Sequence, residues 1–284
     1  MAILTKVDHL QRDLSFKPVV NERPRALSRE QIDHYNARGY IRPLDAFNEL
    51  EVARNRAYFD YLLAEMRVFR DGRDTYAING YHSRCRGIYN LVTHPRLLDF
   101  VQDIVGDDVI AWATHFFCKM PHDPKAVPWH QDASYWPLSP ARTVTVWLAI
   151  DDADPENSAM KFLPGTHTRG HLKWKVTEQD AVLGQEIENA ETMGEPVYDV
   201  LKAGQFSLHA DMLAHGSEPN RSDRRRCGLT IRYCPPEVEP LDRNWGQNAI
   251  LCRGRCDKPW WRFIEPPAGE DLSSPVTHKS IGGN

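Results

Sequence analysis

VIAWATHFFCKM, residues 109–120, separates two kinds of sequence in this chain. The segment is rich in β-branched and aromatic residues, which favour β-strands. Similar segments follow it, divided from one another by Pro, Gly, Asn and Asp, at 143–150, 159–163, 197–202, 205–209 and 227–234. Many short strands after a helical start predict an α+β arrangement that is mainly β, with a sandwich or jelly roll as its core.

The sequence before residue 109 has helical spacing instead. Residues 28–31, Ser-Arg-Glu-Gln, form a capping-box pattern in which the serine hydroxyl can accept hydrogen bonds from the first-turn amides. Apolar residues at helical spacing predict a second helix over 47–66. A third helix is predicted to begin at Pro95 and to end at Gly106. We therefore expect helices to back the β-rich core.

The composition is that of a globular protein. The chain has 284 residues, of which 41% are hydrophobic, and a formal net charge of -4, which does not suggest a nucleic-acid binder. We expect a single domain over 1–284, with an N-terminal arm at 1–27 and a polar C-terminal tail at 265–284. Six scattered cysteines and the lack of an apolar leader or membrane span predict a reduced, cytoplasmic protein with no membrane partner.

The residues WHQD, 129–132, place a histidine and an aspartate one residue apart. On a strand, alternate residues project to one side, so His130 and Asp132 can converge while Gln131 points away. One imidazole and one carboxylate are two of the three ligands in the 2-His-1-carboxylate triad, which leaves open positions on Fe(II). His215, near the end of a later predicted strand, can supply the third ligand.

A second pair of the same kind shows that the motif alone proves little. His209 and Asp211 are also one residue apart. Their third ligand would have to be His215, which is very close in sequence, or His278, which lies in the polar tail. The pair at positions 130 and 132 therefore gives the better triad.

A cation that a dicarboxylate cosubstrate would need follows His215. Arg226 opens the predicted strand, and a planar guanidinium can bind a carboxylate bidentately. Ser217 can add a hydroxyl donor, and Arg232 is the rival candidate because it shares the strand face of Arg226. A zinc-dependent hydrolase could use the same metal ligands, but it would have no evident use for this arginine.

Several segments together resemble the phytanoyl-CoA dioxygenase (PhyH) family of Fe(II)/2-oxoglutarate-dependent oxygenases. They are WHQD (129–132), Tyr135-Trp136, TVWLAIDD (145–152), FLPGTH (162–167), LKAGQFSLH (201–209) and HGSEPNRSDRRR (215–226). The resemblance covers residues 28 to 260 and implies a double-stranded β-helix, a cupin-like jelly roll. One departure is Asn157-Ser158, where relatives commonly have Asn-Gly; we expect it to affect a turn and not the triad.

This resemblance implies an enzyme that uses Fe(II), 2-oxoglutarate and O2, with His130, Asp132 and His215 as iron ligands. Halogenating relatives replace the carboxylate with a small residue, so the presence of Asp132 favours hydroxylation. The resemblance also implies that Arg226 binds the distal carboxylate of 2-oxoglutarate. The further residues expected around the cosubstrate are Ser217, Trp147 and Lys119.

The stretch 115–138 is also similar to bacterial 2-aminoethylphosphonate and 2-trimethylaminoethylphosphonate hydroxylases. We therefore expect hydroxylation of an unactivated C–H bond in a small polar molecule, with an aminoalkylphosphonate as the preferred substrate. An acyl-CoA or a secondary metabolite is the alternative within the family. The segment 79–87, NGYHSRCRG, is either an active-site lid or an ordinary surface loop. The candidate substrate residues are Tyr135, Trp136, Tyr81, Asn79 and Arg86.

Overall fold

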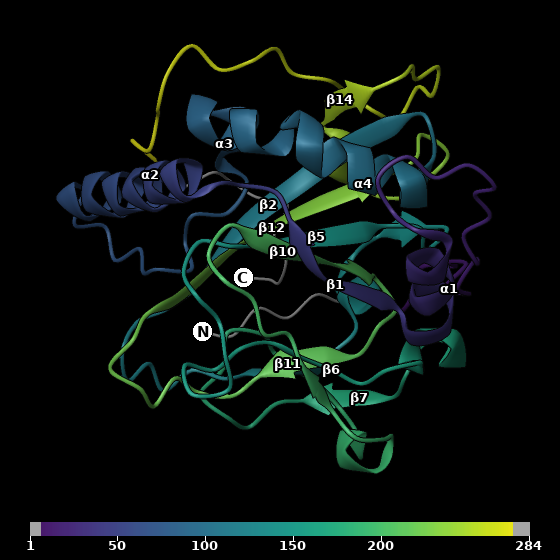
Figure 1. The fold of residues 1–284 in the computed structure, drawn as a ribbon, viewed down its shortest axis with the longest axis horizontal. Coiled ribbons are helices and arrows are strands. Elements are labelled where there is room, and N and C mark those ends of the chain that lie inside the picture. Colours follow the sequence, from purple (N-terminus) through teal and green to yellow (C-terminus); the bar gives the residue numbers. More distant parts are fainter. Residues whose placement is uncertain (1–6, 275–284) are drawn as a thin grey trace.

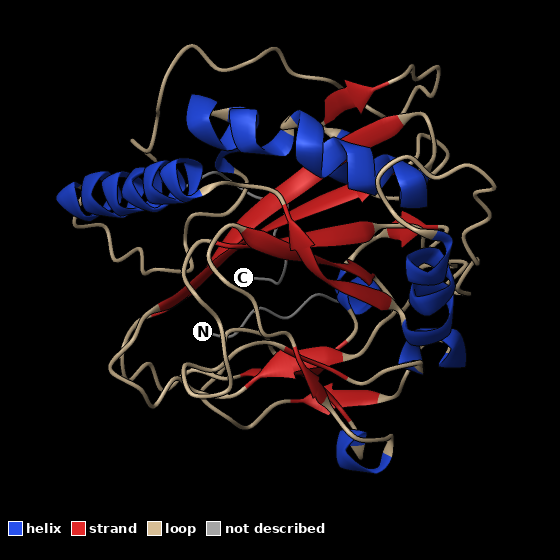
Figure 2. Cartoon of the chain, in the orientation of Figure 1, coloured by secondary structure: helices blue, strands red, loops and turns tan. Residues whose placement is uncertain are grey.

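Two antiparallel sheets face each other, and helices cover the outer side of the larger sheet (Figures 1 and 2). The structure is a computed structural model that describes residues 7–274. The larger sheet contains, in spatial order, β1 (Tyr40–Asp45), β10 (Gln205–Ala210), β5 (Val144–Ala149), β12 (Arg226–Cys234), β2 (Val109–Lys119) and β14 (Ile250–Arg253). The smaller sheet contains β3 (Val127–His130), β11 (His215–Ser217), β6 (Lys161–Phe162) and β9 (Val197–Tyr198). The pair forms the jelly-roll core that the sequence predicts.

Two short strand pairs, four α-helices and five short 3₁₀ helices complete the regular structure of the described residues. The strand pairs are β4 (Leu138–Ser139) with β13 (Glu239–Pro240) and β7 (Trp174–Val176) with β8 (Gln185–Ile187). The helices are α1 (Arg29–Arg38), α2 (Glu49–Val68), α3 (Arg86–Val92) and α4 (Pro95–Val105). In Figure 1, α2, α3 and α4 lie along the outer face of the larger sheet, while β11 and β6 lie on its other side.

The predicted helices begin and end for the expected local reasons. At α1 the Ser28 hydroxyl accepts from the amide of Gln31, and the Gln31 side chain accepts from the amide of Ser28, which completes the capping box. Gly39 ends α1 in the left-handed region at φ 88°. Proline stands in the first turn of α4 and Gly106 ends it. The helix predicted over 47–66 corresponds to α2.

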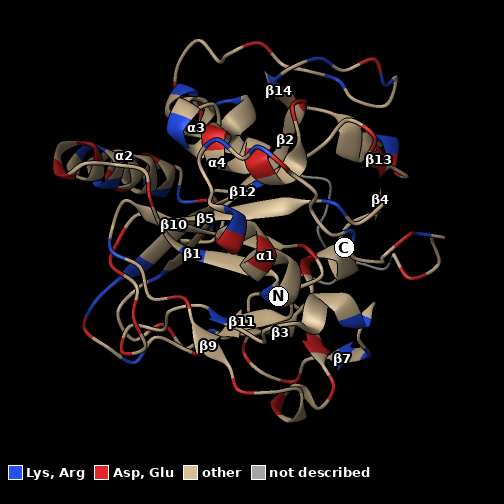
Figure 3. Cartoon of the chain, turned by 45° about the vertical axis from the view of Figure 1, so that its right-hand side comes forward, with Lys and Arg blue, Asp and Glu red and all other residues tan. Residues whose placement is uncertain are grey.

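Strand β12 shows how alternation divides the core from the site. Its residues Cys227, Leu229, Ile231 and Tyr233 pack into the hydrophobic cluster beneath the helices. The alternate residues Arg226, Gly228, Thr230 and Arg232 face the space between the two sheets, where three of them line a cavity. Charged residues lie mainly on the helices and loops, while the central strands are mostly uncharged (Figure 3). Polar residues on the inner face therefore indicate a functional site.

The N-terminal arm is tied to the domain over its described part, residues 7–27. The Asp103 carboxylate on α4 accepts hydrogen bonds from the backbone amides of Arg25, Ala26 and Leu27. Further along, Arg12 donates to the carbonyl oxygen of Trp136. Unsatisfied buried carboxylates are costly, so these contacts fix the path of the arm.

The described part of the predicted C-terminal tail, 265–274, lies beside α3. The Glu270 carboxylate accepts from the amide of Gly87, and the Asp271 carboxylate binds Arg84. The remainder of the 265–284 segment lies outside the described residues. Within residues 7–274 no helix is both long and apolar enough to cross a membrane. The six cysteines are all free thiols.

Candidate active site

His130 and His215 lie side by side on adjacent strands of the smaller sheet. They are register partners on β3 and β11, and their ring centroids are 4.1 Å apart. Asp132 Oδ1 lies 3.6 Å from His130 Nε2 and 3.9 Å from His215 Nε2. One ligand atom from each of the three buried residues can be chosen so that all lie within 4.8 Å of one another. The three side chains thus form one cluster, as the sequence predicts.

The ring orientations suit metal binding. His130 Nδ1 lies 2.8 Å from the carbonyl oxygen of Pro128, and His215 Nδ1 lies 2.9 Å from that of Leu213. A carbonyl can only accept, so each Nδ1 carries the proton and each Nε2 keeps its lone pair for a metal. Burial holds the pKa of His215 well below its usual range, which keeps this ring neutral as a ligand must be. The donor set fits Fe(II) with open positions.

Asp132 reaches the cluster from a turn and not from the strand itself. Strand β3 ends at His130, and Asp132 opens a 3₁₀ turn over Asp132–Tyr135. The side chain of Gln131 does point away, where it donates to the carbonyl oxygens of Gly170 and Met212. Strand alternation therefore predicts the orientation of Gln131 correctly, but the 3₁₀ turn sets the position of Asp132.

The Asp132 carboxylate is held in its charged form. Burial alone would raise its pKa, but contacts with His130 and His209, the neighbouring His215 ring and the charge of Arg232 hold the pKa well below the usual range. The Thr145 hydroxyl donates to Oδ2 at 3.2 Å. A charged carboxylate in this place is ready to bind a cation.

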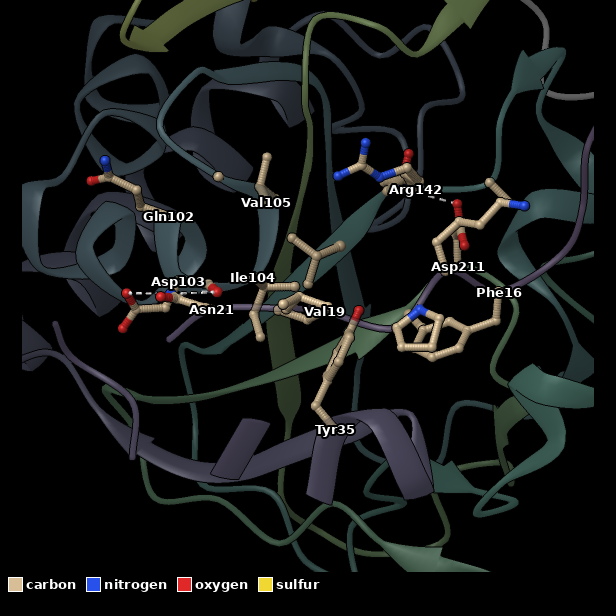
Figure 4. A pocket seen from close by; sticks show the side chains of 18 of the residues that line it. Phe16, Val19, Asn21, Tyr35, Gln102, Asp103, Ile104, Val105, Arg142 and Asp211 are labelled. Carbon is tan, nitrogen blue, oxygen red and sulfur yellow. Dashed lines mark hydrogen bonds between the residues drawn. The ribbon is translucent and has the colours of Figure 1, made fainter. Parts of the chain in front are cut away.

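His209 and Asp211 of the second pair face different spaces. His209 lines the triad cavity, with Nε2 3.7 Å from Asp132 Oδ2. Asp211 instead accepts from the Thr143 amide at 2.9 Å and lines a separate hollow of about 780 Å³ beneath the N-terminal arm (Figure 4). Burial raises the pKa of Asp211 to about 7. His209 therefore lies near the triad, although the sequence predicted no role for it beyond the rejected second pair. Its position in the predicted strand 205–209 was the signal available in the sequence.

Arg226 lies in the same cavity and is rigidly held. Its Nε donates to the Ser158 carbonyl oxygen at 3.0 Å, Nη1 to that of Phe117 at 3.3 Å, and Nη2 to the Ser217 hydroxyl at 3.2 Å. The guanidinium lies 5.6 Å from the centre of the Trp147 ring. Three of its five N–H groups are used, so two remain for a ligand.

Lys119 lies next to Arg226, as its register partner on β2. Its ammonium contacts the Ser158 hydroxyl and the carbonyl oxygen of Ser217, each at 3.3 Å, and the carbonyl oxygen of Glu218. Burial and the neighbouring Arg226 charge lower the pKa of Lys119 to about 6. Lys119 can therefore gain a proton when an anion enters.

Ser158 has a larger role than the expected change of a turn. It adopts a left-handed φ of 70°, the conformation that glycine favours. Its carbonyl oxygen accepts from Arg226 and its hydroxyl contacts Lys119. The departure from Asn-Gly therefore adds a hydroxyl beside the expected cosubstrate residues.

Trp147 lies across the inner face because Gly228 leaves room for it. A Cβ added to Gly228 would lie 2.1 Å from the Trp147 ring, well inside van der Waals contact. Trp147 in turn lines the cavity beside Arg226. The small residue on β12 thus shapes this end of the site.

Tyr135 and Trp136 lie behind the residues that line the cavity. The Tyr135 ring packs edge-on against His130 at 5.9 Å between centroids, and its hydroxyl accepts from the amide of Gln185. Trp136 packs against Trp112 and lies 5.1 Å from the guanidinium carbon of Arg232. The two rings therefore pack behind His130 and Arg232, which line the cavity.

The segment 79–87 packs against neighbouring parts of the fold through hydrogen bonds and one β-bridge. The Tyr81 hydroxyl contacts Arg73, and Arg86 is exposed and donates to the carbonyl oxygen of Pro267. Asn79 pairs with His115 on β2, and its buried Oδ1 has no hydrogen-bond partner within the described part of the chain. These contacts disfavour an active-site lid. Asn79 is the residue of this segment that forms a β-bridge with β2.

Arg224 and Arg225, which directly precede β12, both form ion pairs. Arg224 binds Asp154 and Glu156, and Arg225 binds Asp151 and Asp60. These arginines are thus not free to form a groove for the phosphates of an acyl-CoA.

The fold and the site define a jelly-roll protein with a buried His-Asp-His cluster. The chain belongs to the family described as Phytanoyl-CoA dioxygenase (PhyH), which it matches over residues 35–228.

Among curated proteins, the chain is 32% identical over 156 residues to "Phytanoyl-CoA dioxygenase domain-containing protein 1" of Bos taurus, a match that covers 51% of this chain and 52% of the relative. It is 28% identical over 192 residues to a "Probable alpha-ketoglutarate-dependent hypophosphite dioxygenase" of Stutzerimonas stutzeri, covering 63% and 65%. The chain spans about half the length of the first curated relatives it matches.

Among solved structures, the apo form of the non-heme monooxygenase ThoJ matches with a TM-score of 0.72 and 27% identity, covering 84% of this chain and 88% of that chain. EctD from S. alaskensis, solved with 2-oxoglutarate and 5-hydroxyectoine, matches with a TM-score of 0.68 and 20% identity over 93% and 99% of the two chains. The second likeness supports the fold alone.

Proposed function

We propose that this protein is an Fe(II)- and 2-oxoglutarate-dependent dioxygenase. In this proposal His130, Asp132 and His215 bind the iron. The observation that carries the proposal is that this cluster and the guanidinium of Arg226 line one cavity between the sheets. A metal triad alone would serve many reactions, but a fixed buried cation beside it suits a dicarboxylate that also binds the metal.

Arg226 and Ser217 are proposed to bind the distal carboxylate of 2-oxoglutarate. The three existing hydrogen bonds of Arg226 hold the guanidinium in place, so little freedom is lost on binding. Trp147 supplies an apolar wall, and Lys119 adds positive charge once it is protonated. Bound iron would couple conversion of 2-oxoglutarate and O2 to succinate and CO2 with hydroxylation of a substrate C–H bond.

The substrate is proposed to be a small polar molecule, with an aminoalkylphosphonate such as 2-aminoethylphosphonate, or its N-trimethyl form, as the preferred candidate. Support comes from the cavity, where Thr230, His209 and Arg232 offer polar groups near the triad. Asn79 is the residue of the 79–87 segment that could add a contact from the sheet edge. The surface ion pairs of Arg224 and Arg225 count against an acyl-CoA.

The proposal is tested by anaerobic titration of the Fe(II)–2-oxoglutarate complex with candidate phosphonates, amines and acyl-CoAs. A true substrate should perturb the visible absorption of the complex and then accelerate O2 consumption when air is admitted. If 2-aminoethylphosphonate and its trimethyl form leave both signals unchanged while another compound alters them, the substrate assignment is wrong and the reaction class stands.

A further inference from the structure

Arg232 is a second buried guanidinium in the triad cavity. It lies on the same inner face of β12 as Arg226, further along the strand. Its register partner on β5 is Thr145, whose hydroxyl donates to Asp132. Arg226 instead contacts Ser217, which follows His215 on β11. The triad therefore lies between the two guanidinium groups.

Unlike Arg226, Arg232 has two buried nitrogen atoms that find no acceptor in residues 7–274. Its Nε and Nη1 are buried without a hydrogen-bond partner among the described residues, although the residue is only 4% exposed. Asp132 is near enough to act on its charge, yet no ion pair within residues 7–274 joins the two. The nearest compensation is the ring of Trp136 at 5.1 Å.

A buried cation in this condition needs a partner. Native proteins pair nearly all buried polar groups, and an unpaired charge is costly to bury. A ring face offsets only part of this cost. A ligand with two anionic oxygens would accept from the guanidinium fork and remove the deficit. Because Arg226 already offers such a site at the other end, a second anionic ligand is the natural occupant here.

We infer that Arg232 binds an oxyanion of the primary substrate, either a carboxylate or a phosphonate, on the side of the triad opposite 2-oxoglutarate. This inference rests on the proposed function, because it assigns Arg226 to the cosubstrate. It restricts the substrate to small acids whose reacting carbon lies within reach of the metal when the acid group is on Arg232. Trp136 is then a positioning residue beneath the guanidinium and does not touch the substrate.

The test measures binding of simple oxyanions to the full chain, loaded anaerobically with Fe(II) and 2-oxoglutarate. Isothermal titration uses methylphosphonate and acetate as probes and acetamide as the neutral counterpart of acetate. We expect at least one oxyanion to bind the wild type and acetamide not to bind. Arg232→Gln should weaken the oxyanion at least tenfold and change 2-oxoglutarate affinity less than threefold. Arg232→Lys, which keeps the charge, should lose less oxyanion affinity than Arg232→Gln.

Matched variants separate the possible outcomes. Arg226→Gln should lose 2-oxoglutarate affinity, and Arg224→Gln, which removes one exposed charge, should change neither affinity. The inference is overturned if no oxyanion binds the wild type, if Arg232→Gln binds it normally, or if Arg232→Gln loses 2-oxoglutarate as Arg226→Gln should. Failure of the wild type to bind 2-oxoglutarate would instead count against the proposed function. Circular dichroism checks that each variant is folded. If Arg232→Gln is unfolded, Arg232→Lys replaces it in the oxyanion titration.

Discussion

His130 and His215 are direct register partners on adjacent antiparallel strands, with their rings 4.1 Å apart. The strand pairing thus brings together residues that are distant in sequence. Each ring is fixed by the backbone carbonyl oxygen of the residue two positions before it. Asp132 closes the cluster from the turn after β3. The metal site therefore depends on one strand pair and one turn.

Asp132→Ala should abolish Fe(II)-dependent turnover, by at least a hundredfold, because it removes the only carboxylate of the cluster. The matched control is Asp211→Asn, which alters the second His-x-Asp pair, whose carboxyl faces the hollow under the arm. Metal content and turnover of the purified, folded proteins are the measurements. Full turnover in Asp132→Ala, or equal loss in Asp211→Asn, would refute the assignment.

Gly228→Ala should weaken 2-oxoglutarate binding at least tenfold, because the added methyl group would displace the Trp147 ring from the wall of the cavity. Overpacking of this kind also costs about 1–3 kcal/mol of stability. Gly269→Ala, where an added Cβ meets nothing within 4 Å, is the control. Titration calorimetry measures the 2-oxoglutarate affinity of both variants. Unchanged affinity in Gly228→Ala would show that Trp147 does not shape the site.

Binding of 2-oxoglutarate at pH 7.5 should take up a proton through Lys119. The pKa of this buried ammonium is about 6 in the free protein, and a nearby carboxylate raises it. Affinity should therefore fall as pH rises above 6, by up to about tenfold per pH unit. Calorimetry in buffers of different ionisation enthalpy counts the protons. Lys119→Met should remove the uptake; an uptake of the same size in that variant would assign it elsewhere.

Asp199→Asn should flatten the pH dependence of stability. The buried Asp199 carboxyl, which accepts from the Ser207 hydroxyl at 2.6 Å, has its pKa raised by burial from 3.8 to about 7. The folded protein holds this proton up to about pH 7, while the unfolded chain loses it near pH 4. The stabilisation is therefore complete below pH 4 and is lost as pH rises from 4 to 7, so wild-type stability should fall across this window relative to Asp199→Asn. The difference is on the order of 4 kcal/mol. Urea unfolding at several pH values measures the free energy of unfolding of both proteins. Parallel pH dependence in the wild type and Asp199→Asn would contradict the prediction.

Local patterns predicted the elements whose signals are local. Caps and apolar spacing located three of the helices, and the β-rich segments located the central strands of the larger sheet. Helix α3 was missed because it is short and has a glycine in its first turn, and β1 was missed because it contains Pro43. Both elements are fixed by packing against the rest of the fold, which no local pattern shows.

The roles of His209 and Arg232 illustrate the limit for the site. Alternation places both residues on the inner face of their strands, but only the sheet order puts β10, β5 and β12 side by side. Thr145 is the register partner of both, so the two residues flank it near Asp132. Such lateral neighbours depend on register, which the sequence alone leaves open.

The triad and Arg226 are proposed to hold Fe(II) and 2-oxoglutarate together. The most direct measurement is the visible charge-transfer absorption that appears when 2-oxoglutarate is added anaerobically to the Fe(II)-loaded protein. We predict this absorption in the wild type and in Arg224→Gln, and a shift to at least tenfold higher 2-oxoglutarate concentrations in Arg226→Gln. A wild-type protein that binds Fe(II) but shows no absorption with saturating 2-oxoglutarate would contradict the account.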